Sequence, residues 1–199
     1  MKQLSYKNFK YITCEGVYEP SDDTFLLLDN LHLHGANLVL EIGTGTGLVS
    51  LVASRHVKKV VATDISSLAL KCAKNNFDLN GVASKIQLRQ GSLFKPISRG
   101  ETFDIILFNP PYLPADSREP EDSLTRSWSA GEDGRAIIDE FLLNCDEFLK
   151  DNGKILLIQS SLSNPDKTIE ILKNKRMKIE KLDEKAFFYE TIILFLITK

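Results

Sequence analysis

The stretch with the clearest chemistry is an asparagine that ends an apolar run and precedes two prolines and a tyrosine. The run is Phe103–Phe108, and Asn109, Pro110, Pro111 and Tyr112 follow it. A proline cannot donate to a sheet ladder, and it forces the residue before it into an extended conformation. We therefore predict that Asn109 is held rigidly at the carboxyl end of a strand, where open α/β sheets bind their ligands.

Asn109 and Pro110 would then present two oxygen acceptors, one from the asparagine side chain and one from a proline carbonyl outside the ladder. A planar –NH2 group carries two N–H donors, so two fixed acceptors can grip it through both hydrogens. The exocyclic amine of a nucleobase and the side-chain amide of a glutamine both have this shape. Taken alone, Asn-Pro-Pro also fits an ordinary proline-rich turn after a strand.

A second group of residues predicts a cofactor site. Gly43-Thr44-Gly45-Thr46-Gly47 joins a predicted strand to a predicted helix, and its glycines let a ligand approach the backbone. Asp64 ends the next strand, where a carboxylate can bind both hydroxyls of a ribose. Glu41 is an acid in an apolar strand, and a cationic or N–H-rich ligand would supply the partner that it needs when buried. In the dinucleotide-binding pattern G-x-G-x-x-G, the third glycine would fall at position 48, where this chain has leucine. The glycine spacing therefore argues against a nicotinamide-dependent dehydrogenase.

The elements that must position these residues alternate along the chain. Short apolar runs predict strands at 37–42, 59–63, 86–89, 103–108, 154–159, 177–182 and 191–198. Helical patterns lie at 21–31, 48–55, 66–79, 134–149 and 165–174. This alternation predicts an α/β fold with a mostly parallel sheet and helices on both faces, ending in an antiparallel C-terminal edge hairpin. We expect one domain over 1–199, with a strand or hairpin in a lead-in at 1–20 and the catalytic core at 21–199.

Composition restricts the class of protein. The 199 residues are 43% hydrophobic and 26% charged, which is typical of a globular domain. No run approaches the roughly 18 apolar residues of a membrane helix, and the N-terminus lacks the apolar core of a signal peptide, so a cytoplasmic protein is expected. The net charge of −2 does not show the excess of positive charge that is typical of extended nucleic-acid binding.

The cysteines and histidines show no metal-binding or redox spacing. Cys14, Cys72 and Cys145 form no C-x-x-C pair, so we expect reduced thiols. The three histidines are expected to be structural or solvated, and no metal is expected in this chain.

Together the motifs resemble those of the class I S-adenosylmethionine-dependent methyltransferases, whose sheet is Rossmann-like. The segment from Glu41 to Gly47 resembles their first motif, and Asp64 resembles their ribose-binding acid. The segment from Asn109 to Tyr112 resembles the N-P-P-Y motif of enzymes that methylate planar nitrogen.

Two further segments narrow this resemblance. Val17–Asp29 and Trp128–Arg135 are similar to segments of the eukaryotic and archaeal class of release-factor glutamine methyltransferases, relatives of the HemK enzymes. The match covers about residues 16–160 in the same order. It implies methyl transfer from S-adenosylmethionine to the glutamine amide in the Gly-Gly-Gln motif of a peptide-chain release factor.

The resemblance also implies roles for individual residues. Asn109, Pro110 and Tyr112 would be catalytic. Cofactor contacts would come from Tyr18, Thr24, Glu41, Gly43, Thr44, Gly45, Gly47, Asp64, Ile65, Ser92, Leu93 and Asn109. Substrate contacts would come from Asn109, Pro110, Pro111, Tyr112, Trp128 and Arg135. Many relatives carry an acid near the adenine at the end of the third strand, where this chain departs from the pattern with Ser92.

The resemblance further implies a partner, because relatives of this group often work with a small zinc-binding activator subunit, for which the edge strand around 86–89 is the candidate surface. Two other functions stay open from the sequence. One is N-methylation of an exocyclic amine of DNA, RNA or a nucleotide, which the weak net charge disfavours. The other is a non-catalytic S-adenosylmethionine-binding subunit, which the intact Asn109 motif disfavours.

Overall fold

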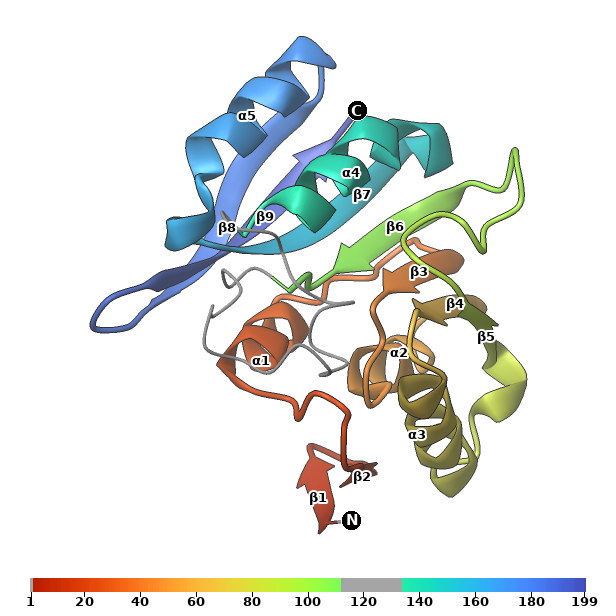
Figure 1. Ribbon diagram of the computed structural model, residues 1–199. Coiled ribbons are helices and arrows are strands. Elements are labelled where there is room, and N and C mark those ends of the chain that lie inside the picture. Colours follow the sequence, from red (N-terminus) through yellow and green to blue (C-terminus); the bar gives the residue numbers. More distant parts are fainter. Residues whose placement is uncertain (1, 112–133) are drawn as a thin grey trace.

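The computed structural model describes residues 2–111 and 134–199, and a seven-stranded sheet forms its centre (Figure 1). In spatial order the strands are β5 (Ile86–Gln90), β4 (Lys59–Asp64), β3 (Leu38–Ile42), β6 (Phe103–Phe108), β7 (Leu149–Ser160), β9 (Thr191–Thr198) and β8 (Lys178–Ala186). The first five strands are parallel, and β9 runs antiparallel between β7 and β8. The predicted α/β class with an antiparallel C-terminal hairpin is confirmed.

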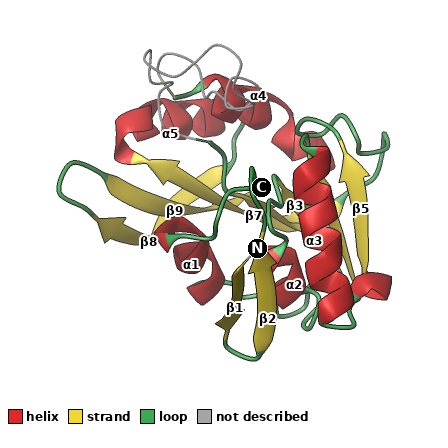
Figure 2. Cartoon of the chain, turned by 60° about the horizontal axis from the view of Figure 1, so that its bottom comes forward, coloured by secondary structure: helices red, strands yellow, loops and turns green. Residues whose placement is uncertain are grey.

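Helices cover both faces of the sheet (Figures 1 and 2). One face carries α1 (Asp22–Asp29), α2 (Leu48–Ala53) and α3 (Ser67–Leu79), and the other carries α4 (Ala136–Asn144) and α5 (Pro165–Asn174). Short 3₁₀ turns lie at η1 (Ala83–Lys85), η3 (Cys145–Phe148) and η4 (Ser161–Ser163). Successive strand residues face opposite sides, so Val39 packs in the core under α1–α3 and Leu40 in the core under α4 and α5. Burial on both faces explains why the central strands β3 and β6 are mostly apolar.

The two edges of the sheet differ in how they are protected. β8 is exposed along nearly its whole length, is rich in lysine, glutamate and aspartate, and has a register shift between Lys181 and Asp183. Charges and irregular register discourage pairing with another chain. β5 lies at the other edge, as predicted for 86–89, and its one charged residue, Arg89, is bound to Glu101 at 2.6 Å. The β5 edge is therefore the one better suited to a partner.

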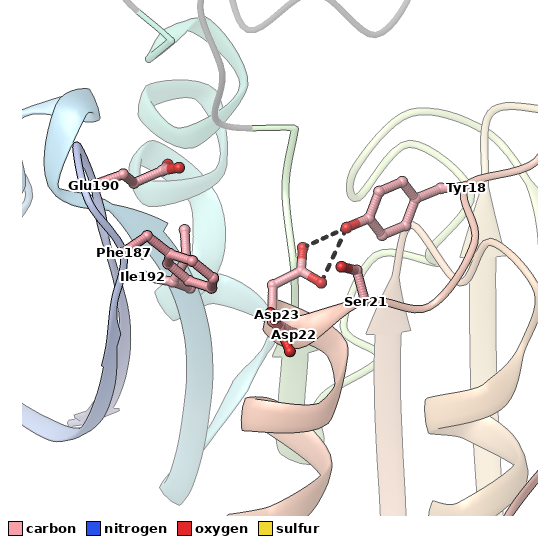
Figure 3. A pocket seen from close by; sticks show the side chains of 7 residues that line it. All are labelled: Tyr18, Ser21, Asp22, Asp23, Phe187, Glu190 and Ile192. Atoms are coloured by element: carbon pink, nitrogen blue, oxygen red, sulfur yellow. Dashed lines mark hydrogen bonds between the residues drawn. The ribbon is translucent and has the colours of Figure 1, made fainter.

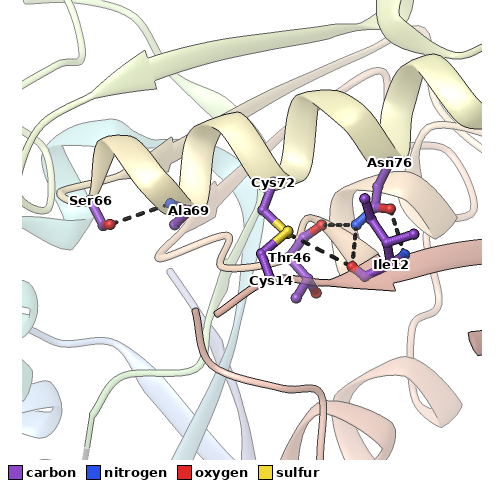
Figure 4. The surroundings of a disulfide bond; sticks show 7 residues. All are labelled: Ile12, Cys14, Thr46, Ser66, Ala69, Cys72 and Asn76. Atoms are coloured by element: carbon purple, nitrogen blue, oxygen red, sulfur yellow. Dashed lines mark hydrogen bonds between the residues drawn. A yellow bond between two sulfur atoms is a disulfide. The ribbon is translucent and has the colours of Figure 1, made fainter. Parts of the chain in front are cut away.

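The N-terminal residues form a small hairpin that docks on α3. It consists of β1 (Lys2–Tyr6) and β2 (Phe9–Thr13), which confirms the hairpin expected in the lead-in. The Asn76 side chain on α3 accepts from the Ile12 N–H at 2.7 Å and donates to the Ile12 carbonyl at 3.0 Å. The same amide donates to the Thr46 carbonyl at 2.8 Å, so it joins the hairpin to the glycine loop (Figure 4).

A disulfide between Cys14 and Cys72 strengthens this attachment, and the prediction of reduced thiols at these positions is wrong (Figure 4). The two cysteines are 58 residues apart, with Cα atoms at 6.1 Å. They meet only because the hairpin docks on α3, and no local spacing signals such a pairing. The third cysteine, Cys145, is a buried free thiol as expected, and burial raises its pKa to about 12.

The predicted boundaries differ most where α4 is shorter than expected and β7 longer, and β8 also extends to Ala186, beyond the predicted end at 182. The helix predicted at 134–149 ends at Asn144, and β7 begins at Leu149 rather than at 154. Leu149 pairs with Phe103, and Lys150 forms an ion pair with Asp104 at 2.7 Å. These contacts with β6 override the local helical pattern. Among the described residues, no helix has the length and apolar character to cross a membrane.

Removing the disulfide should lower the free energy of unfolding without unfolding the protein. A bond that closes a loop of this length typically contributes about 2–4 kcal/mol, mainly by restricting the unfolded chain. The double variant Cys14→Ala/Cys72→Ala should therefore unfold at a lower denaturant concentration than the oxidised wild type. Reductant should shift the wild type to the same midpoint and leave the double variant unchanged. Three reactive thiols in the denatured, unreduced protein would contradict the pairing.

Candidate functional site

The centre of the site is the end of β6, the strand between β3 and β7. Asn109 follows directly, half-buried, and Pro110 is buried behind it. The Phe108 ring packs on Phe141 of α4 at 4.6 Å between ring centroids, which fixes the strand end against the helix layer. Asn109 Oδ1 is buried and has no hydrogen-bond partner in the part of the chain that the structure describes. Because unpaired buried acceptors are rare, this atom is a candidate ligand contact.

The glycine loop lies beside this strand end, between β3 and α2. Gly43, Gly45 and Gly47 have φ values of +71°, +54° and +82°, which other residues adopt only with strain. A Cβ at Gly43 would meet no atom within 4 Å, whereas one at Gly47 would lie 2.7 Å from the Phe77 ring. The first glycine thus borders open space, and the last permits close packing of α2 on α3.

The buried Glu41 side chain fixes the glycine loop by hydrogen bonds. Its Oε2 accepts from the Thr44 hydroxyl at 2.7 Å, from the Ser50 N–H at 2.9 Å and from the Ser50 hydroxyl. The loop and α2 therefore supply donors to one oxygen of this buried acid, and the ligand contact expected at Glu41 stays a prediction. Burial raises the pKa of Glu41 to about 7, opposed by the bonds from Ser50 and Thr44.

Asp64, at the end of β4, lies next to the glycine loop. Its Oδ2 accepts from the Gly45 N–H at 2.9 Å, and its Oδ1 accepts from the Ser66 N–H at 2.9 Å. Burial raises the pKa of the carboxyl, and these backbone donors oppose the rise. Ile65, the next residue, is 41% exposed. The predicted ribose acid and the predicted glycine loop thus meet at one edge of the sheet.

The segment after β5 reaches the same place. The Gly91 N–H donates to the Asp64 carbonyl at 2.9 Å, which brings the ends of β4 and β5 together. Ser92 is half-buried there, and Leu93 is buried in the core under α4 with a φ of +47°.

Tyr18 and Thr24 meet around Asp23 at the start of α1. The Tyr18 hydroxyl donates to both Asp23 oxygens at 3.0 Å, and the Thr24 N–H donates to Asp23 Oδ1 at 2.5 Å. Burial and the Asp23 carboxylate raise the pKa of Tyr18. Asp23 was not predicted as a site residue, although a tyrosine five residues before an acidic helix start is a usable signal.

A pocket of about 170 Å³ opens between α1 and the β8–β9 hairpin (Figure 3). In Figure 3, Tyr18 and Asp23 face Glu190 and Phe187 across this space. Its lining residues are Tyr18, Ser21, Asp22, Asp23, Phe187, Glu190 and Ile192. Phe187 and Glu190 were not predicted as site residues. They lie in the turn between β8 and β9, and only the order of the strands in the folded sheet brings this turn close to α1.

Arg135, predicted to contact substrate, is structural instead. Its side chain is 1% exposed, and its guanidinium donates to the Ser163 carbonyl at 2.6 Å and to Asp139 at 2.6 Å. It thereby joins the start of α4 to the turn before α5. Tyr112 and Trp128 lie outside the described residues. Within the described ranges, no group of three metal-ligating side chains is found.

The raised pKa of Glu41 predicts how stability depends on pH. Between its unfolded value near 4.5 and its folded value of about 7, the folded state binds the proton and the unfolded state does not. Stability from this group therefore falls as pH rises through this window, by on the order of 2–3 kcal/mol. Chemical denaturation of wild type and Glu41→Gln at several pH values isolates the effect as a difference. A difference that is constant from pH 4.5 to 7 would contradict the assignment.

Comparison with known proteins agrees with this geometry. Residues 12–125 match the family model described as methyltransferase small domain. The chain is 43% identical over 166 residues to protein N5-glutamine methyltransferase MJ0928 of Methanocaldococcus jannaschii, covering 82% of each chain. It is 31% identical over 173 residues to methyltransferase HEMK2 of Homo sapiens, covering 81% of this chain and 80% of that protein.

A solved structure shows the same similarity. A chain of the E. cuniculi Mtq2–Trm112 complex, described as responsible for methylation of the eRF1 translation termination factor, superposes with a TM-score of 0.72. It is 25% identical, and the match covers 92% of this chain and 99% of that one. The fold, the paired glycine loop and Asp64, and these matches lead to one conclusion: the chain belongs to the methyltransferase small domain family, among its HemK-related members.

Proposed function

We propose that this protein transfers the methyl group of S-adenosylmethionine to the side-chain amide nitrogen of a glutamine, in the Gly-Gly-Gln motif of a peptide-chain release factor. The observation that carries the proposal is Asn109 Oδ1, a buried acceptor without a donor among the described residues. An amide –NH2 supplies such a donor. MJ0928 and the Mtq2 complex, which are named for action on protein glutamine and on eRF1, support this choice of substrate.

The chemistry requires orientation more than a strong base. An amide nitrogen is a poor nucleophile, because its lone pair is delocalised into the carbonyl group. Asn109 Oδ1 and the Pro110 carbonyl would hold both amide hydrogens and point the nitrogen lone pair toward the methyl group that the cofactor donates. Positioning of this kind can lower a barrier by up to about 7–11 kcal/mol. The two acceptors would also stabilise the positive charge that develops on nitrogen, and this effect is stronger in a dry site.

The residues at the carboxyl edge fit the cofactor, which supplies an electrophilic methyl group when bound. Open space above Gly43 leaves room for a ligand against the backbone. Asp64 lies at the end of β4, positioned by the Gly45 and Ser66 N–H groups to accept from ribose hydroxyls. Tyr18 and Thr24, both bound to Asp23, would border the methionine end.

Two glycine variants separate cofactor binding from folding. Both positions have positive φ, so alanine costs about 1–2 kcal/mol at each. Gly43→Ala adds a methyl group only to open space, so it should weaken S-adenosylmethionine binding while the protein stays folded. Gly47→Ala forces a clash with Phe77 and Ala73, so it should mainly lower stability. Calorimetric binding and thermal unfolding measure the two effects, and equal effects of both variants on both readouts would contradict the assignment.

The open β5 edge is the proposed surface for a small activator subunit. The similar Mtq2 structure is a complex with Trm112, which supports a partner of this kind. β5 carries a single charged residue, in contrast to β8, and the adjacent α3 exposes Leu68 and Leu79 to 48% and 50%. Strand addition at β5 would satisfy its free backbone groups and cover part of this apolar surface.

The function is tested by methyl transfer from tritiated S-adenosylmethionine, with and without the partner subunit. Three acceptors are compared: a release factor, the same factor with its Gly-Gly-Gln glutamine changed to alanine, and total nucleic acid. We expect label only on the intact factor. Asn109→Ala should lower the rate by on the order of 100-fold, because it removes one acceptor from the reacting group. Asn174→Ala, an exposed asparagine at the end of α5, should leave the rate unchanged.

Two results would overturn parts of this proposal. Label on nucleic acid alone would show that the substrate is an exocyclic amine of a nucleobase. The proposed cofactor site would be unaffected by that result. Cofactor binding without label on any acceptor, with the partner present, would favour a non-catalytic binding subunit.

A further inference from the structure

We infer that the Cys14–Cys72 disulfide controls the glycine loop through Asn76, so that reduction of the disulfide weakens the binding of S-adenosylmethionine. This inference rests on the proposed function for the identity of the ligand. The connection between the disulfide and the loop consists of contacts of the described residues, with Asn76 on α3 at its centre (Figure 4).

Asn76 couples the position of the N-terminal hairpin to the position of the glycine loop. Its side chain is fully buried, and its amide group donates to the Ile12 carbonyl at 3.0 Å and to the Thr46 carbonyl at 2.8 Å. An asparagine amide has two N–H donors, so these two bonds use both of them. If the hairpin moved away, a buried N–H group would lose its partner at a cost in free energy. One side chain therefore favours the docked hairpin and the observed loop together.

The helix that carries Asn76 also packs directly on the glycine loop. A Cβ at Gly47 would lie 2.7 Å from the Phe77 ring and 2.8 Å from the Ala73 Cβ, so no space separates the loop from α3. Cys72 and Asn76 are four residues apart on this helix and thus lie on the same face. The disulfide therefore fastens the hairpin to a helix that holds the loop by close packing and by a hydrogen bond.

The chain that follows the disulfide reaches the same loop. The Val17 N–H donates to the Cys14 carbonyl at 3.1 Å, which forms a tight turn immediately after the disulfide. A Cβ at Gly45 would lie 4.0 Å from the Tyr18 carbonyl, so the backbone just after this turn borders the loop. The disulfide thus also fixes the start of a segment that carries Tyr18, one of the predicted cofactor contacts.

The disulfide can be opened from the Cys14 side, because Cys14 is half-buried and Cys72 is 1% exposed. A thiolate of a dithiol reductant would attack the Cys14 sulfur, and the S–S bond would break with its electron pair on Cys72, which then takes a proton. The second thiol of the reductant would attack the mixed disulfide and release Cys14 as a thiol. The reductant is oxidised to its own disulfide, and two electrons and two protons pass to the protein.

Reduction removes the covalent bond between the hairpin and α3 and leaves hydrogen bonds and packing to hold it. The hairpin then samples more conformations, and a ligand that needs the ordered loop must restrict them again when it binds. Coupling between two sites typically changes affinity by about 5- to 150-fold. We expect reduction to weaken cofactor binding by about tenfold, within this range.

The test is calorimetric binding of S-adenosylmethionine to the full chain, oxidised and after reduction with dithiothreitol. The temperature is one at which circular dichroism shows both states to be folded. Reduction should weaken binding by about tenfold, and reoxidation should restore it. Because coupling between sites is reciprocal, saturating cofactor should raise the ratio of reduced to oxidised dithiothreitol at half-reduction by the same factor, about tenfold.

Three variants separate this coupling from a general loss of stability. Cys14→Ala/Cys72→Ala should bind the cofactor as weakly as the reduced wild type and should not respond to dithiothreitol. Asn76→Ala should bind weakly even when oxidised. Asn80→Ala is the matched control, because Asn80 lies one turn further along α3 and donates to the Lys10 carbonyl of the same hairpin at 2.7 Å. With the disulfide and Asn76 intact, it should keep the wild-type affinity and the response to reduction.

Equal affinity of the oxidised and reduced wild type, with a difference only in thermal stability, would overturn the inference and leave the proposed function in place. A response to dithiothreitol that persists in Cys14→Ala/Cys72→Ala would also overturn it. Wild-type affinity in oxidised Asn76→Ala would overturn the role of Asn76. A lack of cofactor binding in both redox states would instead overturn the proposed function, and the inference with it.

Discussion

The site depends on a hydrogen-bond acceptor that the fold buries and leaves without a donor. An unpaired buried acceptor costs about 1–3 kcal/mol, so the surrounding structure must stabilise it. Here β6 supplies this stability, because it pairs with strands on both sides and packs Phe108 on α4. The prolines after Asn109 remove backbone donors that would otherwise turn back toward its side chain.

The remaining elements arrange the proposed cofactor site around that strand end. Glu41 fixes the glycine loop from within the core, and Asp64 fixes it from the neighbouring strand. Asn76 then joins the loop to the N-terminal hairpin, and the Cys14–Cys72 disulfide closes the same connection covalently. Segments that are far apart in the sequence thus all contribute contacts that hold the glycine loop in place. Consequently, a change in the hairpin should reach the cofactor site through α3.

Local patterns were sufficient to predict most of the fold. The alternation of apolar runs and helical patterns predicted the parallel sheet, and β6, α5 and β9 have the predicted bounds. The glycine loop, Asp64 and Asn109 could be predicted as a group, because the ends of parallel strands meet at one edge of a sheet.

What the sequence did not reveal depends on tertiary contacts. The disulfide, the early start of β7 and the structural role of Arg135 each require an element far away in the sequence. Glu190 is similar: it follows an exposed, charged strand, and nothing local distinguishes it from the acids of β8. Only the order of the strands brings it to the edge that carries Asn109.

The central claim is that Asn109 and Pro110 grip an amide –NH2. A crystal structure of the enzyme with S-adenosylhomocysteine and a Gly-Gly-Gln peptide tests it most directly. We predict the glutamine nitrogen at about 3 Å from both Asn109 Oδ1 and the Pro110 carbonyl oxygen, with the nitrogen facing the sulfur of the cofactor product. A glutamine bound elsewhere, with Asn109 Oδ1 still lacking a donor, would contradict the account.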